Sequence, residues 1–275
     1  MNPRIVATFD RLRAAGRKAL IPYITVGFPT RAVTLDVLRQ CVAAGADIIE
    51  LGVPFSDPMA DGPTIQRASE RALAQGVKLA DVLAVVRAFR ESDDTTPIVL
   101  MGYANPIERM GQERFANEAA AAGVDGLIAV DYPPEESAEF AAALRDRHID
   151  PIYLLAPTST DERIASVAGQ ASGYVYYVSL TGVTGAGHMN VDDVRRGVER
   201  LRKEIRLPIG VGFGIRDGET ARTIAGFADA VIIGTRMIEV LDDGPAQDAP
   251  RRAAEFIAAV RQAIDRPAGA GEGAR

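Results

Sequence analysis

Three carboxyl side chains, those of Glu50, Asp57 and Asp61, stand in the segment 48–63, IIELGVPFSDPMADGP. Glu50 lies within an apolar run, whereas Asp61 follows among prolines and glycines. Burying a charge costs free energy unless the charge is paired or used in chemistry. Two carboxyl groups in different surroundings can divide the acid and base roles of a proton transfer. The segment therefore indicates acid–base chemistry. The alternatives are that Glu50 pairs with a core arginine and that Asp61 caps a helix or makes a turn.

Two glycine-containing segments have the composition of phosphate-binding loops. VGFGIRDGET places Gly212 and Gly214 before a helical pattern, and IIGTRM places Gly234 and Thr235 at the start of a short one. Glycine allows a close approach of the backbone, and a helix N-terminus offers free N–H groups to an anion. The pair of segments favours a phosphate site, although either glycine set alone could simply make tight turns.

A third loop, in YVYYVSLTGVTGAGHMN, is rich in glycine at 182, 185 and 187. Pliable loops of this kind can close over a substrate and exclude water. Tyr176 precedes this loop, and its phenol could reach the same site. The alternative is that Tyr174, Tyr176 and Tyr177 are ordinary strand-packing residues.

The sequence lacks the residues that Schiff-base catalysis and zinc catalysis need. A Schiff-base enzyme needs a lysine at the end of a strand, and Lys18, Lys78 and Lys203 stand elsewhere. A zinc site needs clustered ligands, whereas the two histidines and Cys41 are scattered. We therefore expect carboxylate chemistry with neither an imine nor zinc. A Mg²⁺ site made by two carboxylates stays open at this stage.

The elements that must position these residues alternate along the chain. Short apolar runs, typical of parallel strands buried on both faces, are separated by amphipathic helical patterns. The predicted strands are Leu20–Val26, Asp47–Leu51, Pro97–Met101, Gly126–Val130, Pro151–Leu155, Tyr174–Val178, Pro208–Val211 and Ala230–Ile233. The predicted helices between them include Thr30–Ala44, Leu79–Arg90, Gly111–Ala122, Pro134–Arg147, Val191–Lys203 and Gly218–Gly226, and Thr160-Asp-Glu-Arg is a further predicted helix start.

Eight β–α units predict an α/β fold, a single (βα)₈ TIM barrel, with an open doubly wound sheet as the alternative. Extra helices are expected at Ile5–Ala15, before the first strand, and at Ile65–Ala74, after the second. The last helix is expected at Ala249–Ile264. We expect one domain over residues 1–266 and a disordered tail over 267–275. In such a barrel the active site lies at the carboxyl ends of the strands, where the residues above fall.

Composition narrows the function classes. The chain has 275 residues, 47% of them hydrophobic, and a net charge of −6. No block of Lys or Arg indicates binding to nucleic acid or to an anionic membrane. The single cysteine fits a reducing compartment, and no secretory signal or membrane-spanning run is evident. A cytoplasmic globular protein is the expectation.

The motifs together resemble those of the tryptophan synthase α subunit family. IELGVPFSDPMADGPTIQ is the most specific of them, and PYITVGFPT, MGYANPI, DYPPEES, YYVSLTGVTGA and VGFGI follow the family's order and spacing. The resemblance implies retro-aldol cleavage of indole-3-glycerol phosphate to indole and glyceraldehyde 3-phosphate, in the last stage of tryptophan biosynthesis. It implies no cofactor in this chain. It also implies a pyridoxal-phosphate β subunit that receives the indole, in an α₂β₂ heterotetramer.

The resemblance also assigns roles to residues. Glu50 corresponds to the general acid/base, Asp61 to the carboxylate at the indole N–H, and Tyr176 to the tyrosine beside them. The phosphate-binding positions are Gly185, Gly214, Gly234 and Thr235. The indole-pocket positions are Tyr23, Met101 and Tyr103. Thr184 corresponds to the loop threonine that meets Asp61 on closure.

Some positions depart from the family or lie outside its chemistry. Leu180 stands where some members have arginine, and Thr235 where serine is common. Arg236 is expected to face solvent. Asp57, on a loop tip, is expected to be solvated, and the resemblance suggests that this loop faces the partner. The alternatives to an α-subunit lyase are a stand-alone lyase, a sugar-phosphate isomerase or epimerase, and an inactive activator of the β subunit.

Overall fold

A single parallel sheet forms the centre of the molecule. The computed structural model describes residues 1–178, 190–212 and 214–266. Within them, the nine-stranded sheet has the order β5-β4-β3-β2-β1-β9-β8-β7-β6. The strands are β1 (Ala19–Thr25), β2 (Ile49–Gly52), β3 (Ile98–Gly102), β4 (Gly126–Ala129), β5 (Asp150–Pro151), β6 (Leu154–Leu155), β7 (Val175–Val178), β8 (Ile209–Gly212) and β9 (Ala230–Ile233). The predicted (βα)₈ TIM barrel is confirmed.

The fifth predicted strand closes the barrel in two pieces. β5 and β6 stand at opposite ends of the sheet order, yet only Ile152 and Tyr153 separate them in the chain. The Ile152 N–H donates to the Leu127 carbonyl at 2.9 Å, on the β4 side. The Tyr176 N–H donates to the Tyr153 carbonyl at 3.0 Å, on the β7 side. The predicted run Pro151–Leu155 is therefore not one regular strand, because its backbone groups are shared between two neighbours.

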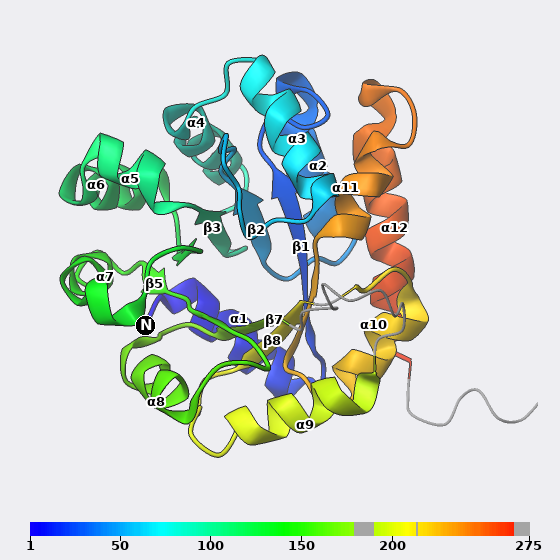
Figure 1. Cartoon of the computed structure of the whole chain (residues 1–275). Coiled ribbons are helices and arrows are strands. Elements are labelled where there is room, and N and C mark those ends of the chain that lie inside the picture. The colour runs from blue at the N-terminus through cyan, green and yellow to red at the C-terminus, as the bar shows by residue number, and fades with distance from the viewer. Residues whose placement is uncertain (179–189, 213, 267–275) are drawn as a thin grey trace, which may run out of the picture.

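Helices surround the strands (Figure 1). They are α1 (Pro3–Ala14), α2 (Thr34–Ala43), α3 (Pro63–Ala74), α4 (Leu79–Arg90), α5 (Ala104–Met110), α6 (Gln112–Ala122), α7 (Ala138–Arg145), α8 (Asp161–Gln170), α9 (Val191–Leu201), α10 (Gly218–Ala225), α11 (Thr235–Asp242) and α12 (Ala249–Ile264), with 3₁₀ turns η1 (Arg31–Val33), η2 (Pro134–Glu136) and η3 (Ala246–Asp248). Both extra helices are confirmed as α1 and α3. The α5 helix was not predicted. In the described ranges no helix has the length and apolar character needed to cross a membrane.

The core has an inner and an outer layer. The inner layer groups Ile21 of β1, Ile232 of β9 and Ile48, which directly precedes β2, with Ile5 and Phe9 of α1. The α1 helix therefore packs against the interior of the barrel at one end. The outer layer fills the space between the sheet and the surrounding helices. With one end filled by α1, the carboxyl ends of the strands are left to form the site.

Candidate active site

Glu50 lies inside the barrel on β2. It pairs in register with Tyr23 of β1 and Val99 of β3, and its side chain is fully buried. Ile48, two residues earlier, belongs to the inner layer, so alternation places Glu50 on the inward face as expected. Since β2 ends at Gly52, Glu50 stands two residues before the strand end rather than the one predicted.

The two oxygens of the Glu50 carboxyl differ in their hydrogen bonding. The Tyr174 hydroxyl donates to Oε1 at 2.6 Å, whereas Oε2 is buried and has no partner among the residues that the structure describes. Burial raises the pKa of Glu50 to about 8, and the bond from Tyr174 opposes this only partly. Within the described chain no arginine pairs with Glu50, so the core ion-pair alternative is wrong. At neutral pH the side chain is mostly a neutral acid with a proton to give.

Asp61 lies in the loop between β2 and α3, close to the helix start. Its N–H donates to the Pro58 carbonyl at 3.0 Å, and its carbonyl accepts from Gln66 Nε2 at 2.8 Å. Burial raises the pKa of the Asp61 carboxyl to about 6, while the phenol of Tyr103 lowers it. The N-cap of α3 is Gly62, so the capping alternative for Asp61 is wrong. At neutral pH Asp61 is mostly ionised, in contrast to Glu50.

Three tyrosines lie near these carboxyls. Burial raises the pKa of Tyr23 and of Tyr103, and the charge of Asp61 raises both values further. Burial, then the charges of Glu50, Tyr23 and Asp61, raise the pKa of Tyr176 well above its ordinary value. The Tyr103 hydroxyl accepts from the Ala60 N–H at 3.1 Å, which ties its ring to the Asp61 loop. The predicted catalytic residues Glu50, Asp61 and Tyr176 are therefore brought together.

An apolar wall borders the Asp61 side of the site. Tyr103 stacks on Phe55 with ring centroids 5.1 Å apart. Met101 of β3 pairs in register with Gly52 of β2 and is half-buried. The Tyr23 ring lies over Gly52, where an added Cβ would stand 2.2 Å from its hydroxyl. This combination of rings and a thioether suits a flat aromatic ligand.

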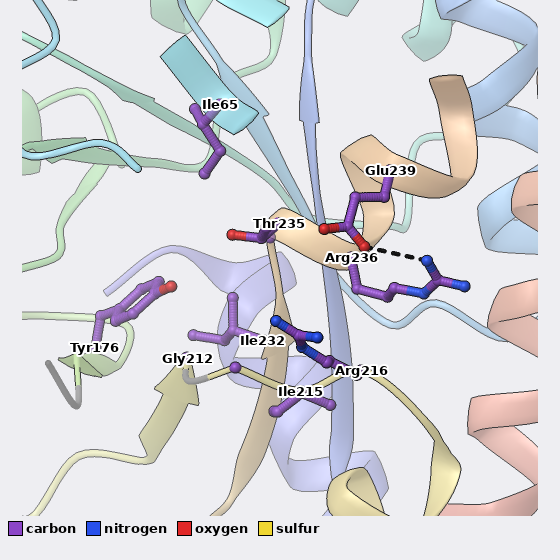
Figure 2. A pocket seen from close by; sticks show the side chains of 11 residues that line it. Ile65, Tyr176, Gly212, Ile215, Arg216, Ile232, Thr235, Arg236 and Glu239 are labelled. Carbon is purple, nitrogen blue, oxygen red and sulfur yellow. Dashed lines mark hydrogen bonds and ion pairs between the residues drawn. The ribbon is translucent and has the colours of Figure 1, made fainter. Parts of the chain in front are cut away.

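A cavity of about 290 Å³ opens beside Tyr176 (Figure 2). Its lining includes Gly214, Gly234 and Thr235, three of the predicted phosphate positions. Thr235 opens α11, whose first internal bond runs from the Ile238 N–H to the Gly234 carbonyl. The earlier N–H groups of the helix have no intrahelical acceptor and can bind an anion. The cavity is therefore suited to a phosphate group next to the carboxyl pair.

Charged residues also line this cavity. Arg236 Nη1 pairs with Glu239 Oε2 at 3.1 Å, and its side chain is 42% exposed. The prediction that Arg236 simply faces solvent therefore describes it only in part. Arg216, which the sequence reasoning missed, lines the same cavity. A cation within a predicted phosphate loop is the signal that could have found it.

Several predictions lie outside the described residues. They are the phosphate position Gly185, the loop threonine Thr184, the departure Leu180 and the tail at 267–275. Strand packing, the alternative reading for Tyr174, is not its whole role, because its hydroxyl also donates to Glu50 Oε1. Its alternation with Tyr176 on one strand face was the available signal. Across residues 1–178, 190–212 and 214–266, no group of three His, Cys, Asp or Glu side chains could hold a metal ion.

Comparisons with known proteins agree on one family. The family model described as "Tryptophan synthase alpha chain" matches residues 9–267. The tryptophan synthase alpha chain of Cupriavidus metallidurans is 60% identical over 262 residues, which is 95% of this chain and 99% of that protein. The one from Burkholderia cenocepacia strain J2315 is 58% identical over 272 residues, which is 99% of each.

Solved structures give the same result. Tryptophan synthase subunit alpha from Legionella pneumophila superposes with a TM-score of 0.90 at 43% identity, covering 96% of this chain and 99% of that one. A Mycobacterium tuberculosis tryptophan synthase chain superposes with a TM-score of 0.88 at 37% identity, covering 97% of this chain and all of that one.

Proposed function

The chain belongs to the tryptophan synthase alpha chain family, whose members cleave indole-3-glycerol phosphate, and we propose that Glu50 and Asp61 carry out this cleavage here. It is thus a carbon–carbon lyase of tryptophan biosynthesis that works with a β-subunit partner. Family membership supports this function over the sugar-phosphate isomerase alternative. The observation that carries the proposal is the buried Glu50 carboxyl, with a pKa of about 8, in one site with an ionised Asp61.

Glu50 acts as the general acid and base. The C–C bond breaks when indole C3 is protonated, the side-chain hydroxyl loses its proton, and the bonding electrons return to the ring as the aldehyde forms. A neutral carboxylic acid can give its proton to C3 and then, as a carboxylate, accept the hydroxyl proton. Tyr174 holds one carboxyl oxygen, which leaves Oε2 as the oxygen free to meet substrate.

Asp61 stabilises the charge that develops on the indole ring. Protonation at C3 makes an indolenine cation whose N–H is its most positive edge. An ionised carboxylate at this edge is a preorganised electrostatic partner for the transition state. Tyr23, Met101 and Tyr103 provide the apolar walls for the ring, and Tyr176 lines the phosphate cavity and interacts with the charges of both carboxyls.

The phosphate group occupies the cavity at Gly214, Gly234 and Thr235, with Gly185 as a further expected contact, while Thr184 is expected to meet Asp61 when the loop closes. Free N–H groups at the start of α11 support this assignment, because they complement an anion. Thr235 offers a hydroxyl in place of the serine common in the family. Binding energy at the phosphate, remote from the reacting bond, then positions the indole ring between its two carboxyls.

The proposal also covers the assembly in which this chain works. We expect an α₂β₂ heterotetramer in the cytoplasm, with pyridoxal phosphate in the β subunit and no cofactor in this chain. Residues 1–266 would form one domain. Met59 is 86% exposed, and it lies beside the exposed Asp57 in the loop after β2. A large exposed apolar side chain at a loop tip supports the proposal that this loop faces the partner.

Indole release from indole-3-glycerol phosphate tests the proposal. The purified chain is assayed with and without a cognate β subunit, as wild type and as Glu50→Gln. We expect slow turnover alone, a higher rate with the β subunit, and a loss of about 100-fold or more in the variant, because Gln cannot transfer the proton. The control is Glu255→Gln. Glu255 is exposed and pairs with Arg251, so this variant should keep wild-type activity.

Each other outcome assigns a different role. Fast turnover that the β subunit does not change would indicate a stand-alone lyase. Turnover that persists in Glu50→Gln would remove Glu50 from the mechanism. If neither form releases indole under any condition, while the β subunit is still activated, the chain is an activator rather than an enzyme.

A further inference from the structure

We propose that Arg216 binds the phosphate group of the substrate, adding a guanidinium to a site otherwise formed by backbone N–H groups and the Thr235 hydroxyl. The inference rests on the proposed function, because it assumes that this cavity receives the phosphate. It goes beyond the glycines and Thr235, because it concerns a charged side chain. Arg216 is a substrate-positioning residue and takes no part in the bond-breaking step.

The backbone around Arg216 is anchored on both sides. Ile215, one residue earlier, is 3% exposed and belongs to the outer core layer. Asp217, one residue later, is the N-cap of α10, and its carboxylate accepts from the Thr220 N–H at 2.8 Å. Ile215 and Asp217 therefore fix the backbone position of Arg216 and so the point from which its side chain extends. Figure 2 shows that the side chain extends into the cavity, on the side of Ile232 and Thr235.

The charges of the cavity leave Arg216 unneutralised. Among the described residues that line the cavity, Glu239 is the only carboxylate, and it already pairs with Arg236 at 3.1 Å. The neighbouring carboxylate, Asp217, is engaged as a helix cap. Among the described residues, no ion pair involves Arg216. A cation without a carboxylate partner, directed into a cavity that also contains a helix N-terminus, favours an anionic ligand.

The chemistry of the ligand fits a guanidinium. A phosphate monoester carries roughly −1.5 to −2 charges at pH 7 and three acceptor oxygens. The N–H groups at the start of α11 are neutral donors, whereas Arg216 adds a full positive charge with up to two parallel donors. Because Arg216 is exposed, salt should weaken its contribution. The residue should therefore affect binding of phosphorylated ligands much more than the chemical step.

The test compares Arg216→Gln and Arg216→Lys with wild type. We measure kcat and KM for indole-3-glycerol phosphate, inhibition by inorganic phosphate, and cleavage of the phosphate-free analogue indole-3-glycerol. In Arg216→Gln we expect KM and the phosphate inhibition constant to rise roughly tenfold, with kcat within about twofold. Cleavage of the phosphate-free analogue should be unchanged. Arg216→Lys should recover part of the lost affinity, because lysine restores the positive charge but not the two parallel N–H donors of the guanidinium.

Arg251→Gln is the matched control. It removes one positive charge from an exposed site on α12, where Arg251 pairs with Glu255, and it should leave all three measurements unchanged. An unchanged phosphate inhibition constant in Arg216→Gln would overturn the inference. So would equal losses for the phosphorylated and phosphate-free substrates, because they indicate a structural role. If wild type cleaves neither substrate, the proposed function fails, and inorganic phosphate binding measured by calorimetry still decides the role of Arg216.

Discussion

At the scale of single residues, burial separates two chemically similar groups. Glu50 and Asp61 have nearly the same acidity in water, but burial raises the pKa of Glu50 to about 8 and that of Asp61 to about 6. Between these values one group is mostly protonated and the other mostly ionised. The site is therefore poised with an acid and an anion near neutral pH.

The pH dependence of kcat/KM should show this division. We expect activity to rise near pH 6, as Asp61 loses its proton, and to fall near pH 8, as Glu50 loses its proton. Asp61→Asn should lower the rate by about 100-fold or more and remove the rising limb. A rising limb that persists in Asp61→Asn would assign it to another group.

The stability of Glu50→Gln should also depend on pH. The folded-state pKa of Glu50, about 8, lies above the ordinary value of 4.5, so the wild type loses folding free energy as pH rises from about 4.5 to 8. Gln carries no such penalty. Relative to wild type, the free energy of unfolding of the variant should therefore increase by up to about 1.4 kcal/mol for each pH unit in this window. Urea unfolding at pH 5, 7 and 9 measures the gain. Glu255→Gln, at an exposed site, should show no comparable trend.

At the scale of elements, close packing between strands fixes the position of Tyr176, the tyrosine proposed for the active site. An added Cβ at Gly212 of β8 would stand 2.1 Å from the Tyr176 hydroxyl and 2.4 Å from its ring carbon Cζ. Tyr176 is held on the neighbouring strand, since it pairs in register with Gly210. The glycine is thus required by the position of a neighbouring side chain and not by its own backbone angles.

Gly212→Ala should therefore displace Tyr176. We expect kcat/KM to fall by about tenfold or more, with a smaller loss of folding stability, because the Tyr176 ring can turn toward the cavity. The control is Gly169→Ala in α8, where an added Cβ meets no atom of the described residues within 4 Å. It should keep full activity and gain up to about 1 kcal/mol of helix stability. Equal losses of activity in both variants would contradict the steric argument.

The sequence predicted most elements because their signals are local. Apolar runs, glycine ends and capping residues place the strands of the barrel, and α4 and α12 have the predicted bounds. The α5 helix was missed because Pro106 in its first turn marks a loop as readily as a helix start. The division of the fifth strand into β5 and β6 depends on which neighbours its backbone groups meet, and local sequence does not encode this.

The site was predictable only in part, for the same reason. Glu50 and Asp61 stand in one motif, 11 positions apart along the chain. The bond between Tyr174 and Glu50 joins residues 124 positions apart, and only the closed barrel brings them together. The direction of Arg216 depends on the anchors at Ile215 and Asp217.

At the scale of the whole molecule, the last helix is tied to the first strands. α12 packs against α2 and α10. Its buried Arg261 donates to the Lys18 carbonyl at 2.9 Å and to Asp47 Oδ2 at 3.1 Å. The same Asp47 oxygen accepts from the Leu20 N–H at 3.0 Å. One guanidinium therefore links residues near both ends of the barrel sequence.

Removing this link should cost much more than removing a surface pair. Arg261→Leu leaves the Asp47 carboxylate buried with less compensation, and we expect a loss on the order of 3 kcal/mol in the free energy of unfolding. Arg251→Leu on the same helix removes an arginine that is 62% exposed and should cost less than about 1 kcal/mol. Denaturant unfolding at pH 7 compares the two variants. Similar losses in the free energy of unfolding would show that the buried pair contributes little to stability.

The bare Oε2 oxygen of Glu50 affects what laboratory evolution would find. A screen that rewards heat resistance alone would favour substitutions at this position, since each replaces a costly buried acid. A screen that rewards growth without supplied tryptophan would eliminate the same substitutions. Sequencing the survivors of both screens would therefore distinguish the residues kept for the reaction from those kept for the fold.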